Sequence, residues 1–148
     1  MLRPFLSFVL ILALGACTTP AEPPRALVTQ DGADIAAVLA ADGRFTIFLA
    51  AVEREELTAL LSTDGPLTVF APIDPQEEEV QVNLHIAPGR ITADDLRGVA
   101  GRIGMIDGDL ITVESGDSLT LNGQGSVIQS GVGATNGLIH VIDRPLSR

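Results

Sequence analysis

The hydrophobic period of the chain changes at Gly65-Pro66, and this change constrains the fold more than any other feature. Before it, apolar residues recur at spacings of three and four, which is typical of helices that pack one face against a core. The three groups are Ile35, Val38 and Leu39; Phe45, Phe48, Leu49 and Val52; and Leu57, Leu60 and Leu61. The Gly-Pro pair ends helix, because proline lacks a backbone N–H and clashes with the preceding turn. We therefore expect three short helices before residue 65.

After residue 66 the pattern is that of strands. Residues 67–71 form a short apolar run, and residues 80–86 alternate apolar and polar side chains, which predicts a half-buried strand. Further apolar runs are separated by Asp107-Gly108 and Asn122-Gly123, and such pairs are typical of tight hairpin turns. The last third of the chain is therefore expected to form a meander of antiparallel strands.

Two further elements complete the predicted architecture. Residues 91–98 are a short helix candidate with Thr92 as its N-cap and with Asp94 and Asp95 in the first turn. Residues 138–142 are apolar on both faces, which predicts a central, covered strand. Helices followed by mostly antiparallel strands predict an α+β fold over residues 32–146.

The N-terminal segment has the pattern of an export signal. Arg3 precedes an almost wholly apolar run, residues 5–14, which is too short to span a membrane but typical of a secretory leader. The run ends in Leu14-Gly15-Ala16-Cys17, which resembles the bacterial lipobox. The resemblance implies removal of residues 1–16 and lipid attachment at Cys17; the alternative is an ordinary signal peptide with an incidental cysteine.

A proline-containing segment, residues 17–31, follows this signal and is expected to act as an extended linker between lipid and domain. Several acyl chains on one cysteine would hold the protein durably at a membrane. We expect an exported protein that faces the periplasm or the cell surface. Thr18 directly after the cysteine favours the outer membrane, by analogy with enteric bacteria.

Composition excludes several classes of function. The net charge is −10, from 9 arginines and 19 acidic residues without lysine, and such a chain is repelled by nucleic acid. A single cysteine excludes an internal disulfide, and two histidines exclude the common multi-histidine metal sites. The acidic groups at residues 77–79 and 107–109 lack the spacing of a calcium loop. We therefore expect neither a metal nor another cofactor.

Three segments resemble, in order, the signature blocks of the fasciclin domain family. They are residues 65–74 (GPLTVFAPID), residues 84–90 (LHIAPGR) and residues 136–146 (NGLIHVIDRPL). The residues that these blocks place in the structural motif are Phe70, Asp74, His85, Asn136, His140 and Asp143. The resemblance implies a wedge-shaped antiparallel β-sandwich edged by N-terminal helices, and a role in adhesion or matrix contact.

The chain departs from the family pattern at three places. Leu84 stands where the family has a tyrosine before the central histidine, and the link between Asp74 and His85 is only ten residues long. Gly131 and Val132 occupy the positions of an Asp-Ile pair implicated in integrin contact in some animal members. We therefore do not expect integrin binding here.

His85 and His140 are the candidate general bases, but a base needs a nucleophile within reach. None of the serines weighed for this role, Ser62, Ser118 and Ser126, sits in a nucleophile-elbow context. The resemblance implies that both histidines are structural. Strand alternation places His85 on the polar face of its predicted strand, whereas His140 shares an apolar face. Buried imidazoles need hydrogen-bond partners, and Asp74 and Asn136 are the candidates.

These observations predict a non-enzymatic, lipid-anchored envelope protein that mediates adhesion by contact with a protein or polysaccharide partner. Residues 77–79 and 131–135 are expected to be the segments least constrained by the fold. The alternative is a periplasmic binder of a small apolar ligand, a carotenoid or a lipid, because the shortened link could open a pocket. A hydrolase is the least favoured interpretation, since no nucleophile–base pair is evident.

Overall fold

The computed structural model of the protein describes residues 32–63, 65–74, 79–98 and 101–148. The predicted leader, Cys17 and the linker to residue 31 lie outside these ranges, as do residues 77 and 78. No helix within the described ranges is both long and apolar enough to cross a bilayer.

Three short helices precede the first strand, as the helical spacing predicts. They are α1 (Ile35–Asp42), α2 (Thr46–Arg54) and α3 (Thr58–Ser62). The helix α1 begins where the Asp34 carboxylate accepts a hydrogen bond from the Ala37 N–H at 2.8 Å. It ends at Gly43, whose φ of 80° is a left-handed conformation that glycine adopts without strain.

Seven strands form one sheet with the order β2-β1-β7-β6-β5-β4-β3. Their bounds are β1 (Leu67–Pro72), β2 (Ile86–Pro88), β3 (Gly101–Gly104), β4 (Leu110–Ser115), β5 (Leu119–Leu121), β6 (Gly125–Ala134) and β7 (Gly137–Ile142). The α+β class is thereby confirmed. One pairing differs from the antiparallel arrangement that the resemblance implied, because β1 and β7 lie parallel. A parallel pair needs a long connection, and the rest of the domain supplies it.

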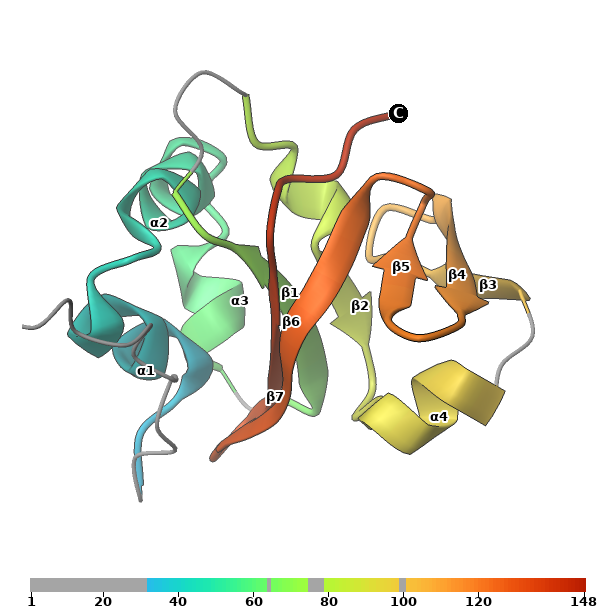
Figure 1. Ribbon diagram of the computed structural model, residues 1–148. Coiled ribbons are helices and arrows are strands. Elements are labelled where there is room, and N and C mark those ends of the chain that lie inside the picture. Colours follow the sequence, from blue (N-terminus) through green and yellow to red (C-terminus); the bar gives the residue numbers. More distant parts are fainter. Residues whose placement is uncertain (1–31, 64, 75–78, 99–100) are drawn as a thin grey trace, which may run out of the picture.

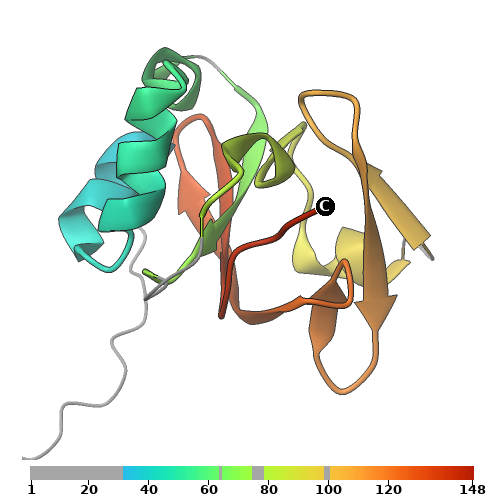
Figure 2. The same ribbon diagram turned by 90° about the horizontal axis from the view of Figure 1, so that it is seen from above.

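The sheet turns at β6, which pairs with β5 at its first residues and with β7 along the remainder. Two register shifts interrupt its pairing with β7, and such irregularities bend a strand. Figures 1 and 2 show the result: α1–α3 lie on one side of β1 and β7, and β3–β5 lie on the other with α4 (Ala93–Gly98) below them. The far ends of the sheet meet, because the Ile106 N–H donates to the Ile86 carbonyl at 3.0 Å.

The central strands are covered on both faces, as predicted for residues 138–142. Every residue of β1 and of β7 is buried. Side chains alternate between two apolar clusters, so Val69 and Ala71 pack with the helices while Phe70 packs with β3–β5. The domain therefore has three layers around two apolar clusters.

Both predicted Asx-Gly turns are present, and the helix predicted for residues 91–98 is α4. Gly108 has a φ of 91°, and Asn122 and Gly123 have φ values of 55° and 64°. These left-handed conformations are the ones that favour Asx and Gly at tight turns.

Two predictions about the remaining segments were wrong. Residues 80–86 do not form one strand, because a 3₁₀ turn, η1 (Val82–Leu84), buries apolar side chains there and only β2 follows it. Residues 131–135 are not a loosely constrained loop. Val132, Gly133 and Ala134 belong to β6 and pair with β7.

Candidate functional site: the signature residues and the two buried histidines

The His85 side chain lies just after η1 and is fully buried, so its predicted position on a polar face was wrong. Its Nδ1 lies 2.7 Å from the Gln81 carbonyl oxygen, and its Nε2 accepts the Leu146 N–H at 2.9 Å. A carbonyl can only accept, so the ring proton is on Nδ1. The edge of the imidazole contacts Phe48 with the ring centroids 5.8 Å apart. Burial lowers the pKa of His85 to about 4, so the ring is neutral at pH 7.

His140, at the centre of β7, is also hydrogen-bonded to backbone groups through both of its ring nitrogens. Its Nε2–H donates to the Ile91 carbonyl at 2.7 Å, and its Nδ1 accepts the Gly131 N–H at 3.3 Å. The ring stacks on Phe70 with the centroids 5.4 Å apart. Burial lowers the pKa of this imidazole too. The expectation that Asp74 and Asn136 would be the partners was wrong, because backbone groups occupy both nitrogens of each histidine.

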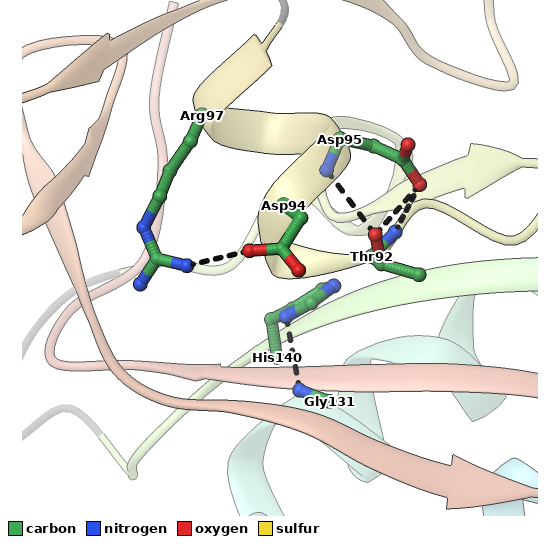
Figure 3. A network of polar contacts seen from close by, with 6 residues as sticks. All are labelled: Thr92, Asp94, Asp95, Arg97, Gly131 and His140. Carbon is green, nitrogen blue, oxygen red and sulfur yellow. Dashed lines mark hydrogen bonds and ion pairs between the residues drawn. The ribbon is translucent and has the colours of Figure 1, made fainter.

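A reciprocal capping contact holds α4 over His140 (Figure 3). The Thr92 hydroxyl accepts the Asp95 N–H at 3.1 Å and donates to the Asp95 carboxylate at 2.7 Å. The Thr92 N–H donates to the same carboxylate at 2.9 Å, and this bond most strongly lowers the pKa of Asp95. The contact fixes the start of α4 and thereby the preceding Ile91 carbonyl that His140 uses.

Asn136 joins the helices to the sheet. Its Oδ1 accepts the Ile35 N–H at 2.9 Å, and its Nδ2 donates to the carbonyls of Leu61 and Thr63 at 2.7 and 2.9 Å. It therefore satisfies a backbone donor at the start of α1 and two carbonyls at the end of α3.

The two signature aspartates make structural contacts with residues far from them in the sequence. Asp74 accepts the Thr46 hydroxyl at 2.7 Å and the Ile47 N–H at 2.9 Å, and so caps α2 from a distant part of the chain. Asp143 exchanges hydrogen bonds with Ser126: its Oδ1 accepts the Ser126 N–H at 2.7 Å, and its own N–H donates to the Ser126 carbonyl at 3.0 Å. Of the six signature residues, Phe70 and His140 stack on each other, and the others lie at separate junctions and not around one cleft.

The arrangement leaves no base available at either histidine, because both ring nitrogens of each are already hydrogen-bonded. Among the described residues, no buried side-chain nitrogen or oxygen lacks a partner. The same part of the chain contains no group of three or more His, Cys, Asp or Glu side chains placed to hold a metal. The polar groups of the interior are therefore committed to holding the fold.

Among the hollows that the described residues form at the surface, two lie near the signature segments. One, of about 480 Å³, is lined by Asp34, Ser62, Arg90 and Thr135 among others. The other, of about 570 Å³, lies between residues 79–81 and the C-terminal segment and includes Arg144 in its lining. Both present polar side chains, which suits contact with polar partners.

Sequence reasoning missed several participants in these contacts. The buried Thr68 hydroxyl donates to the Gly89 carbonyl at 2.7 Å and accepts the Ile91 N–H at 2.9 Å. Thr92 was predicted as a cap, but its reciprocal bond with Asp95 could have been found from their three-residue spacing. The backbone partners of the histidines carry no sequence signal, because every residue has the same backbone groups.

Replacing His140 by alanine is expected to lower the free energy of unfolding by about 3 kcal/mol. The change would leave the Ile91 carbonyl and the Gly131 N–H unpaired and would remove the ring stacked on Phe70. Thermal unfolding followed by circular dichroism measures this as a melting temperature lower by roughly 10 °C or more. Asp94→Ala, which removes only an exposed ion pair with Arg97, is the control and should have little effect. Wild-type melting of His140→Ala with loss of an activity would contradict the structural role.

Comparisons with known proteins agree with this architecture. The family model described as the fasciclin domain matches residues 74–148. The chain is 31% identical over 115 residues to Protein sll1483 of Synechocystis sp. (strain ATCC 27184 / PCC 6803 / Kazusa), covering 76% of this chain and 59% of that protein. It is similar in fold to a FAS1 domain pair from the insect cell adhesion molecule fasciclin I, with a TM-score of 0.66, 18% identity, and coverage of 78% of this chain and 51% of that one. The chain therefore spans between half and three-fifths of these relatives, and it belongs to the fasciclin domain family.

Proposed function

We propose that this protein is a non-enzymatic adhesion module, anchored by lipid on Cys17, that binds a protein or polysaccharide in the cell envelope. Fasciclin domains are associated with cell adhesion and with extracellular protein interaction, and they are generally non-enzymatic. The observation that carries the proposal is that every described buried side-chain nitrogen and oxygen already has a hydrogen-bond partner. The side chains of both histidines and of Asn136 are hydrogen-bonded to backbone groups of the domain itself. Recognition of a partner therefore has to occur at the outer surface.

The polar character of the hollows favours a polar partner over a small apolar ligand. The hollow beside α1 combines the Arg90 guanidinium with the hydroxyls of Ser62 and Thr135. Inside the domain, the largest side chains of both apolar clusters are fully buried. Within the residues that the structure describes, we find no specific support for the carotenoid or lipid alternative.

The anchor is tested by mass spectrometry of the mature N-terminus in membrane fractions of the native bacterium. We expect a chain that begins at an acylated Cys17, and a Cys17→Ser variant that leaves the membrane fraction. An unacylated chain in the cytosol would contradict the proposal.

The contact function is tested separately, by comparing adhesion and aggregation of cells that lack the protein with those of cells that express it. We expect wild-type protein to restore adhesion and Cys17→Ser to restore it poorly. Arg90→Gln and Arg144→Gln, one in each hollow, report which face carries the contact, because neither exposed arginine supports the core. Normal adhesion without the protein, or turnover of a substrate by the purified chain, would overturn the proposal.

A further inference from the structure

Residues 143–148 form a C-terminal strap that follows β7 (Figure 1). Its buried anchor is Leu146, which is fully buried in the cluster that also contains Leu84, Leu121 and Ile142. The fit is tight, since a Cβ at Gly125 would lie 3.1 Å from the Leu146 side chain. Apart from this anchor, the contacts of the last two residues are exposed hydrogen bonds and ion pairs.

The Leu146 N–H donates its hydrogen bond to a titratable group, Nε2 of His85, at 2.9 Å. The other ring nitrogen faces the Gln81 carbonyl at 2.7 Å and must carry the proton. A second proton can therefore bind only at Nε2. Two donors, the new N–H of the ring and the Leu146 N–H, would then face each other, and the strap amide would have to move away.

Among the described residues, no charged group in contact with His85 compensates for a charge on the ring. The elements packed around it carry charged residues only at exposed positions: Glu53 and Arg54 on α2, Glu79 before η1, and Asp143, Arg144 and Arg148 on the strap. The strand β1, whose Phe70 N–H donates to the His85 carbonyl, carries none. Protonation is therefore unfavourable while the strap is closed and becomes favourable once the ring gains access to water.

We propose that protonation of His85 at Nε2 releases the C-terminal strap as a local and reversible opening while the central sheet stays folded. Opening would withdraw Leu146 from its apolar cluster and remove one wall of the 570 Å³ hollow, which the strap forms with Gln81 and Gln124. Acid would thus replace a polar surface by an apolar one. This inference does not depend on the proposed adhesion function.

The other buried histidine provides an internal comparison. His140 accepts the Gly131 N–H in the middle of β6. On either side of Gly131, residues of β6 pair with β7 and hold the backbone in place. Beyond the contact of Asp143 with Ser126, the strap has no such ladder. Protonation of His85 can therefore be accommodated by a local movement of the strap, whereas protonation of His140 cannot be accommodated by a local movement of β6.

Hydrogen–deuterium exchange of the full-length chain, read at single amides by NMR between pH 8 and pH 4, tests the inference. The open strap binds a proton with a pKa near 6.5 and the closed strap with a pKa of about 4, so opening becomes easier as the pH falls. After correction for intrinsic rates, we expect the protection factor of the Leu146 amide to stay nearly constant from pH 8 to about pH 6.5 and then to fall by up to about tenfold per pH unit. At pH 4 it should be about 150-fold lower than at pH 8. Amides of β1 and β7 should keep their protection.

Two variants make the test specific. His85→Gln replaces the ring by a side chain that does not titrate, and it should make Leu146 protection independent of pH in this window. His140→Gln is the matched control and should keep the wild-type dependence. Loss of protection in parallel at Leu146 and in β7 of the unaltered protein, or no dependence on pH at Leu146, would overturn the inference. That comparison needs no variant, so it decides the question even if His85→Gln does not fold.

Discussion

Asn136→Ala is expected to lower the free energy of unfolding by about 4 kcal/mol. The substitution removes one acceptor and two donors and leaves the Ile35 N–H and the Leu61 and Thr63 carbonyls without their partner. Each stranded buried group costs about 1–3 kcal/mol. Because domains of this size are stable by only about 5–15 kcal/mol, the variant should unfold at a much lower urea concentration than the wild type.

The control for this prediction is Gln124→Ala, which removes exposed hydrogen bonds to Ser147 and should cost less than about 1 kcal/mol. Asn136→Asp adds a second test. It keeps an oxygen for the Ile35 N–H but places another oxygen against two carbonyls, so it should be destabilised like the alanine variant. If both Asn136 variants unfold like Gln124→Ala, the residue does not join the helices to the sheet.

The elements of this fold could be predicted where the sequence pattern is local. The stripe Phe45, Phe48 and Val52 indicates a helix because helical spacing needs nothing from the rest of the chain. The prediction for residues 80–86 failed because alternation assumes that one face meets solvent. Here the 3₁₀ turn buries Val82 and Leu84 and turns His85 inward as well. Tertiary burial overrode a pattern that is otherwise typical of strands.

The signature residues could be named from the sequence, but their partners could not. Asp74 and Asn136 were the plausible partners of the histidines because they are side chains with a chemical identity. The actual partners are the backbone groups of Gln81, Ile91, Gly131 and Leu146. Only the path of the chain brings such groups to an imidazole, so composition and spacing cannot reveal them.

The contacts of the signature residues also explain why a family pattern predicts fold better than partner. Asn136, Asp74 and Asp143 each join elements far apart in sequence, and His140 connects β7 to the segment before α4. Of these residues, Asn136 also lines the first hollow, but all of its hydrogen bonds described above go to backbone groups of the domain itself. The exposed residues around the hollows, such as Arg90, are free to differ while the same junctions are kept.

Gly137→Ala should also be strongly destabilising, for a steric reason. Gly137 pairs with Leu67 where β1 and β7 begin to run in parallel. A Cβ at this position would lie 1.9 Å from the Leu67 carbonyl oxygen and 2.9 Å from the Ile35 side chain. The oxygen belongs to a buried backbone, so it cannot move without shifting the start of the central pair. We expect a loss of about 3 kcal/mol or more in the free energy of unfolding.

Chemical denaturation of Gly137→Ala and of Gly104→Ala measures this effect against a matched control. Gly104 lies in β3, where a Cβ would meet only the Leu110 side chain at an ordinary distance of 3.9 Å. Alanine also restricts the unfolded chain, so Gly104→Ala should be neutral or slightly stabilising, by up to about 1 kcal/mol. The same chemical change should therefore have opposite consequences in two strands of one sheet. Equal stability of the two variants would mean that β1 and β7 do not approach as closely at Gly137 as the geometry requires.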